Sequence, residues 1–157
     1  MKRLFYIFIA IIICFGVGYT ARLFQVDSIS TWYPMLNISI LTPPNKIFTI
    51  AWSIIYICSG ISIGLIWNKQ TILDTGLGWI FILQLIFNFA WSFLFFYLQD
   101  PLSGLIDIML LDLSVVFYFI ICYRINRFAA WLFVPYIFWL ILATYLNIYI
   151  VINNPID

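Results

Sequence analysis

Five long apolar runs constrain this chain more than any other feature. A helix needs about 20 apolar residues to cross the roughly 30 Å hydrocarbon core of a bilayer. With 66% hydrophobic and 8% charged residues, the chain has too little polar surface for a water-soluble domain. We find no internal repeat and no linker. The sequence therefore predicts an all-α membrane protein, a single five-transmembrane-helix bundle whose spans lie near residues 4–21, 44–67, 77–98, 101–123 and 128–152.

The first apolar run follows Lys2 and Arg3, as the hydrophobic region of a secretory signal peptide would. It is longer than that region usually is, and further spans come after it. We therefore expect this run to be retained as a membrane helix.

Lys and Arg residues are distributed unevenly between the two sides of the predicted bundle. An odd number of spans places the termini on opposite sides, and cytoplasmic loops are enriched in Lys and Arg. The N-terminal side carries Lys2, Arg3, Lys69, Arg124 and Arg127, whereas the other side carries Arg22 and Lys46. The N-terminus is therefore predicted to be cytoplasmic, and both the loop 22–43 and the C-terminus to be external. The net charge of +1 comes from these residues, and no basic patch indicates nucleic-acid binding.

Histidine is absent from the sequence. Its absence excludes histidine-based zinc sites, a Ser-His-Asp triad and haem held by a proximal histidine. Cys14, Cys58 and Cys122 each lie inside a span without paired spacing, so we expect them to be small buried residues and not metal ligands. No Walker loop or dinucleotide-binding motif is present.

The segment TWYPMLNISILTPPNKIFTIAW, residues 31–52, interrupts the apolar sequence between the first two spans. Thr42-Pro43-Pro44 predicts an extended approach, an N-cap and the start of a helix, because proline disfavours a helical residue before it but is tolerated in a first turn. Ser30, followed by Thr31, Trp32 and Tyr33, is placed to cap a short helix across the mouth of the bundle. Trp32 and Tyr33 have two interpretations, an interfacial aromatic belt or part of a lid over a cavity.

Aromatic and polar residues share one helical face in three of the spans. Uncompensated amides are costly in hydrocarbon, so the amides on these faces should point into the bundle. Aromatic stripes also arise from ordinary packing, but three that combine tryptophan with polar groups favour a lined cavity. The faces are Phe48, Trp52, Tyr56 and Ser59 in the second span, Gln84, Asn88, Trp91 and Phe95 in the third, and Pro135, Trp139, Ala143, Leu146 and Asn147 in the fifth.

These residues resemble the TspO/MBR family, whose members are known as tryptophan-rich sensory proteins, translocator proteins or peripheral-type benzodiazepine receptors. The resemblance covers nearly the whole chain and is most specific in the fifth span, AAWLFVPYIFWLILATYLNIYIVINN. The third span contributes Asn88 within QLIFNFAWSFLFF. The loop-to-helix signature is matched by Trp32, Tyr33, Leu36, Thr42, Pro43, Pro44, Phe48 and Trp52, and the fifth span matches in Pro135, Tyr136, Trp139, Ala143, Leu146 and Asn147.

The resemblance implies a five-helix bundle in the lipid bilayer, commonly a homodimer, that binds porphyrins and hydrophobic drugs in a cavity beneath the first loop. The expected ligand is a protoporphyrin-like molecule, and no cofactor is expected to be required. Trp52 and Trp139 match tryptophans implicated in light-dependent porphyrin degradation in bacterial relatives, which makes them the catalytic candidates. By position the ligand-binding residues would be Tyr33, Pro44, Phe48, Trp52, Asn88, Trp139, Ala143 and Leu146, to which the polar and aromatic face of the third span adds Trp91.

Two departures from the family pattern bear on the choice of ligand. Ile38, Ser39 and Leu41 stand where the family usually has Lys-Pro and a tryptophan before the double proline. The family's cholesterol motif needs a basic residue at the end of the fifth span, and none follows Arg127. We therefore expect a porphyrin rather than cholesterol as the ligand.

Two aspartates lie within the fourth span. Asp107 resembles an aspartate common in the family near the start of this helix, and we expect it to orient loops or partner helices rather than to act in catalysis. Asp112 lies on another face near mid-span, where it is either tolerated in a contact between helices or part of a proton relay.

Pairs of small residues at four-residue spacing allow helices to approach closely in lipid. Gly60 and Gly64 form one such pair, and Gly16 and Thr20 form another. The alternative for either pair is that it faces lipid.

Three functions remain open from the sequence. The first is a membrane receptor, sensor or carrier that binds porphyrins. The second is a light-dependent porphyrin-degrading activity, and the third is a transporter of small molecules, lipids or sterols, or an assembly factor without a ligand.

The predicted orientation is tested by single cysteines introduced at Ser30 and Asn126. An impermeant thiol reagent should label them from opposite sides of the membrane, because they lie in loops at opposite ends of the spans. The unsubstituted chain is the control for the native cysteines. Labelling of both positions from the same side would contradict the five-span topology.

Overall fold

The computed structural model describes residues 2–67 and 75–154. Five of its helical segments are long and apolar enough to cross a membrane, which confirms the prediction of an all-α membrane bundle and makes the chain an integral multi-pass membrane protein. Lys69, which entered the charge comparison, lies outside the described residues.

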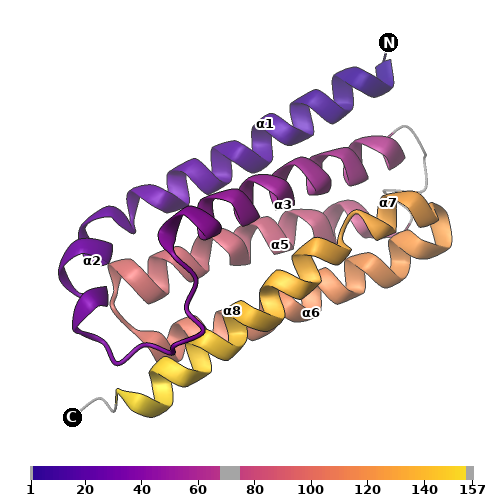
Figure 1. The fold of residues 1–157 in the computed structure, drawn as a ribbon. Helices are drawn as coiled ribbons and strands as arrows, with labels where there is room; N and C mark the ends of the chain where they lie inside the picture. Colours follow the sequence, from indigo (N-terminus) through magenta and orange to yellow (C-terminus); the bar gives the residue numbers. More distant parts are fainter. Residues whose placement is uncertain (1, 68–74, 155–157) are drawn as a thin grey trace.

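The five spans lie side by side in one elongated bundle (Figure 1). α1 packs between α3 and α5, α6 packs between α5 and α8, and contacts between α8 and α3 close the ring. α1 begins at one end of the bundle and α8 ends at the other, as an odd number of spans requires (Figure 1). The spans are α1 (Lys2–Leu23), α3 (Asn45–Ile66), α5 (Leu77–Ser92) continued by the π-helix η2 (Phe93–Tyr97), α6 (Pro101–Ile125), and the pair α7 (Arg127–Trp131) and α8 (Val134–Asn153).

The fifth span is broken between α7 and α8. Pro135 lies in the first turn of α8, and its ring nitrogen has no hydrogen to donate to a carbonyl of the preceding turn. A proline is tolerated in a first turn, so the helix restarts there. The fifth span begins at α7, which the side chain of Asn126 caps by accepting a hydrogen bond of 3.3 Å from the backbone N–H of Ala129.

The fourth span begins with a well-formed cap on the loop that follows η2. The carboxylate of Asp100 accepts hydrogen bonds of 3.1 Å from the backbone N–H groups of Leu102 and Ser103, and another from the Ser103 hydroxyl. These bonds, led by the one from the hydroxyl, lower the pKa of Asp100 below its ordinary value. Asp100 therefore stays ionised at neutral pH, as the positive end of a helix dipole favours.

The segment 22–43 contains more helix than the sequence predicted. α1 continues to Leu23, and a short helix, α2 (Val26–Thr31), precedes the 3-10 turn η1 (Tyr33–Met35). The prediction that Ser30 caps the start of a short helix is wrong. Ser30 lies inside α2, where its hydroxyl donates to the carbonyl of Asp27 at 2.9 Å, because α2 begins one turn before the local capping pattern indicated.

The double proline has the predicted effect on the chain. Pro44 is the N-cap of α3 with extended backbone angles, φ −58° and ψ 149°, and the helix begins at Asn45. No side chain caps this helix start, so the extended backbone alone sets where the second span begins.

α1 and α3 approach most closely along one pair of small residues. A Cβ atom added at Gly60 would lie 2.7 Å from the backbone nitrogen of Ile11, and one added at Gly64 would lie 2.6 Å from the Cα atom of Ile7. A Cβ atom at Gly16 would meet nothing within 4 Å. The Gly60–Gly64 pair is therefore a helix-packing site, whereas Gly16 faces away from the packed interior.

We predict that Gly64→Ala destabilises the bundle, because the added methyl group would overlap the backbone of α1. Overpacking of this kind typically costs about 1–3 kcal/mol. Thermal unfolding in detergent measures the change, and Gly16→Ala is the matched control, since its methyl group meets open space. Equal melting temperatures for the two variants would show that α1 does not pack on α3 as described.

Candidate functional site

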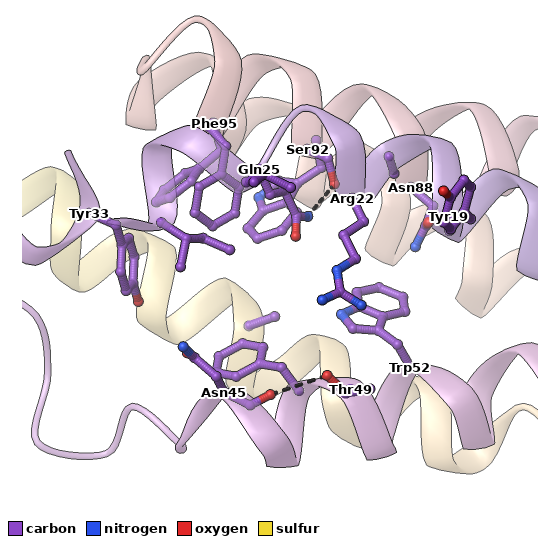
Figure 2. Close-up of a pocket in the computed structure, with 18 of the residues that line it drawn as sticks. Tyr19, Arg22, Gln25, Tyr33, Asn45, Thr49, Trp52, Asn88, Ser92 and Phe95 are labelled. Atoms are coloured by element: carbon purple, nitrogen blue, oxygen red, sulfur yellow. Dashed lines mark hydrogen bonds between the residues drawn. The ribbon is translucent and has the colours of Figure 1, made fainter. Parts of the chain in front are cut away.

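A cavity of about 510 Å³ lies at the end of the bundle that segment 24–43 covers. α1, α2, α3, η1, α5, η2 and α8 all contribute to its lining. Figure 2 shows labelled side chains of α1, η1, α3, α5 and η2 around a common space. Its volume is typical of a small-molecule site.

Two groups of stacked aromatic rings line opposite parts of the cavity. On α3, Trp52 stacks on Tyr56 with 5.6 Å between ring centroids and 26° between the planes. On α5 and η2, Trp91 stacks on Phe95 at 5.3 Å and 20°. Flat ring faces of this kind are suited to a planar apolar ligand, since aromatic groups prefer offset-stacked or edge-to-face contacts.

Asn88 joins three of the helices beside the cavity. It is 4% exposed, accepts a hydrogen bond of 3.2 Å from the hydroxyl of Tyr56, and donates one of 3.2 Å to the hydroxyl of Tyr136. The predicted inward orientation of this amide is confirmed. Because both ends of the amide are bonded, its rotamer is fixed by α3 and α8.

Asn147 forms a second polar junction at the wall of the cavity. Its Oδ1 atom accepts a hydrogen bond of 3.0 Å from the indole N–H of Trp91, and its Nδ2 group donates to the carbonyl of Pro101 at 2.8 Å. Gln84 is also buried as predicted, with 1% exposure, but it does not line the cavity. Its amide atoms have no hydrogen-bond partner in the described part of the chain.

The segment over the cavity is hydrogen-bonded to both sides of its mouth. On the α5 side, Gln25 donates to the hydroxyl of Ser92 at 2.8 Å, and Ser28 donates to the carbonyl of Phe96 at 2.5 Å. On the α8 side, the side chain of Asn154 bonds to both the N–H and the carbonyl of Asn37, at 2.8 and 3.1 Å. These bonds hold residues 24–43 as a lid, a name we keep for this segment.

Tyr33 is the aromatic residue of the lid that lines the cavity. Its ring packs on those of Phe96 and Phe95, with centroids 5.7 and 6.4 Å away. Burial raises the pKa of the Tyr33 hydroxyl above its ordinary value, and a hydrogen bond with Thr42 opposes that shift. The phenol is therefore neutral at physiological pH, and this arrangement corresponds to the lid interpretation of Trp32 and Tyr33.

Most of the ligand-binding residues expected from the sequence are brought together at this cavity, and two are not. Pro44 does not line it, because this exposed residue turns the chain into α3 at the edge of the mouth. The seven that line the cavity are Tyr33, Phe48, Trp52, Asn88, Trp91, Ala143 and Leu146.

Trp139 lies behind the wall of the main cavity. Its ring contacts those of Phe48 and Trp52, with centroids 5.2 and 6.4 Å away, and these rings stand between it and the main space. It lines a separate cavity of about 20 Å³, room for roughly one water molecule. Its buried indole N–H has no partner in the described part of the chain.

Sequence reasoning missed several polar residues of the cavity. Ser92 follows Asn88 by one helical turn and lies within the stretch from Gln84 to Phe95 that forms the predicted third-span face, so the same periodicity includes it. Asn45 and Thr49 share one helical face with Trp52 and Tyr56, so periodicity along the second span would also have found them. Arg22, Gln25 and Thr42 lie at the end of α1 and in the lid, and no helical periodicity connects them to the faces of the spans.

Neither aspartate of the fourth span lines the cavity. Asp107 is 6% exposed, and its Oδ2 atom has no hydrogen-bond partner in residues 2–67 and 75–154. Asp112 accepts a hydrogen bond of 2.8 Å from the hydroxyl of Thr144, which joins α6 to α8. One of the two alternatives given for Asp112, a contact between helices, is therefore present.

Comparison with known proteins finds similarity over most of the chain. The TspO/MBR family model matches residues 10–152. The chain is 35% identical to the tryptophan-rich protein TspO of Archaeoglobus fulgidus, over 92% of this chain and 94% of that protein. It is 32% identical to the protein of the same name from Chlorobaculum tepidum, over 98% and 99% of the two chains. It is also 27% identical to the human translocator protein, over 74% of this chain and 70% of that protein.

We predict that Ser28→Ala loosens the lid, because the carbonyl of Phe96 loses its bond from the lid. A net hydrogen bond is worth about 1 kcal/mol, so amide hydrogen exchange in residues 26–41 should become about fivefold faster. Thr31→Ala is the control, since its hydroxyl bonds only within α2, to the carbonyl of Asp27. A similar acceleration in both variants would show that the bond to Phe96 does not hold the lid.

Proposed function

The chain belongs to the TspO/MBR family, and on that premise we propose that it is a membrane sensor or carrier that binds a porphyrin in the cavity beneath the lid. The observation that carries the proposal is the cavity of about 510 Å³, with stacked aromatic walls and a hydrogen-bonded cover. The porphyrin itself is the ligand that the family resemblance implies. The shape and chemistry of the cavity support it.

A porphyrin ring is planar and apolar on both faces, so it gains most from flat aromatic walls in a site that excludes water. Trp52 and Trp91 supply such walls from α3 and α5. The amides of Asn88 and Asn147 are hydrogen-bonded to other residues of the bundle. They therefore do not need water inside the cavity as a hydrogen-bond partner.

The proposed ligand is the porphyrin ring rather than a catalytic haem. The sequence has no histidine, the usual proximal ligand of haem iron in globins and peroxidases. The three cysteines do not line the cavity. Binding is therefore assigned to contacts with the ring, which a metal-free porphyrin satisfies.

We also propose that the lid faces the external side of the membrane and that the protein acts as a homodimer. The orientation follows from the excess of Lys and Arg on the N-terminal side. The homodimer follows from the family resemblance.

Light-dependent degradation of the porphyrin is the second candidate function. The contact between Trp52 and Trp139, with ring centroids 6.4 Å apart, favours it. A porphyrin excited by light generates reactive oxygen species from dioxygen, and indole is readily oxidised. Trp52 lines the ligand space, and Trp139 lies directly behind it. If Trp52 is oxidised, the indole of Trp139 is in contact with it and can take part in the oxidation.

We predict that Trp52→Ala weakens porphyrin binding by about thirtyfold, because truncation of a buried aromatic anchor commonly costs about 2 kcal/mol or more. Absorbance titration of the purified protein in the dark measures the affinity. Trp79→Ala is the control, since Trp79 is 71% exposed on the outside of α5. If wild-type protein in a folded state binds no porphyrin, the proposed function is wrong.

The two candidate functions are separated by Trp52→Phe and Trp139→Phe under illumination. Phenylalanine keeps a ring face but lacks the easily oxidised indole. If the protein degrades porphyrin, both variants should bind it in the dark and bleach it more slowly in the light than wild type does. A wild-type complex that is stable in the light leaves the sensor or carrier function alone.

A further inference from the structure

Arg22 is the charged residue among the side chains that line the cavity. It lies in the last turn of α1, and Figure 2 shows its guanidinium group extending into the cavity toward α3. Within the described part of the chain, Arg22 forms no ion pair with a carboxylate. The cavity therefore presents a cation whose charge no neighbouring acid neutralises.

We infer that Arg22 binds the anionic end of the ligand, and that the cavity selects flat apolar molecules bearing a carboxylate over neutral molecules of the same shape. This inference rests on the proposed function, which supplies the apolar body of the ligand. It adds a binding residue and a chemical requirement, namely a carboxylate that lies near the membrane surface when the ring is in the cavity.

Arg22 lies among both polar and aromatic residues of the cavity. Figure 2 shows its guanidinium group beside Trp52, with Gln25 and Ser92 above it in this view and Asn45 and Thr49 of α3 below. An amphiphile therefore fits with its charged group at Arg22 and its ring against the neighbouring aromatic walls.

Guanidinium chemistry suits a carboxylate in this position. Its planar N–H groups bind two carboxylate oxygens at once, which arginine does better than lysine. Beside apolar walls the attraction between the two charges is stronger than in water, because the local dielectric constant is lower.

Arg22 also has a simpler role available. A basic residue in the last turn of α1 interacts favourably with the helix dipole and marks the edge of the membrane. Such a role stabilises the protein but does not distinguish a charged ligand from a neutral one. The comparison of an acid with its ester therefore separates the two roles.

The test measures the affinity of the full chain in lipid nanodiscs for protoporphyrin IX and for its dimethyl ester, with empty nanodiscs subtracted. Wild type should prefer the acid. Arg22→Gln should weaken binding of the acid by about tenfold and leave the ester unchanged, and Arg22→Lys should keep part of the preference. Lys46→Gln is the matched control, since Lys46 is a cation at the same end of the bundle that does not line the cavity, and this variant should behave as wild type does.

The inference is overturned if Arg22→Gln changes the affinities for acid and ester by the same factor, or changes neither. A second pair of probes, pyrenebutyric acid and its methyl ester, separates this failure from failure of the proposed function. If wild type binds neither porphyrin, the proposed function is wrong. The inference then stands if Arg22→Gln abolishes a preference for pyrenebutyric acid over its ester, and it is overturned if wild type shows no such preference.

Discussion

The fold depends on how helices are held together where the surrounding lipid supplies no hydrophobic driving force between them. At one end of α3, Gly60 and Gly64 let the backbone of α1 come close, and van der Waals packing holds that end. At the other end large aromatic side chains keep the helices apart, and Asn88 links α5 to α3 and α8 by hydrogen bonds. The cavity lies at this second end because small residues pack the first.

The lid covers the cavity and is attached to the bundle by hydrogen bonds, which are individually weaker than the packing between the spans. Its bonds from Gln25 and Ser28 to the α5 side, and from Asn37 to Asn154, are individually worth about 1 kcal/mol in net terms. The rings of Trp32 and Tyr33 add apolar packing on Phe95 and Phe96. The cover therefore rests on a few hydrogen bonds and one small aromatic cluster, whereas the spans pack along their whole length.

In the proposed function, the aromatic walls and Arg22 recognise different parts of the ligand. Trp52 and Trp91 offer flat apolar surface, which favours a class of molecule by shape. Arg22 offers charge at the edge of the membrane, which distinguishes members of that class by their ends. Trp139 packs against Trp52 from behind. The part proposed for Trp139 in photochemistry therefore depends on its contact with the indole of Trp52 and does not need direct contact with the ligand.

The sequence by itself determined the membrane class, the five spans and the inward faces of Asn88, Trp91 and Asn147, because apolar run length and helical periodicity are local properties of a chain. Only the tertiary structure decided that the lid contains α2, that Trp139 stands behind Trp52, and that Arg22 enters the cavity. A periodic face shows which side of a helix turns inward, but not which side chain of the neighbouring helix stands in front of it. The path of a connecting segment is likewise set by its contacts with distant residues, here Ser92, Phe96 and Asn154, and no local pattern in residues 24–43 contains that information.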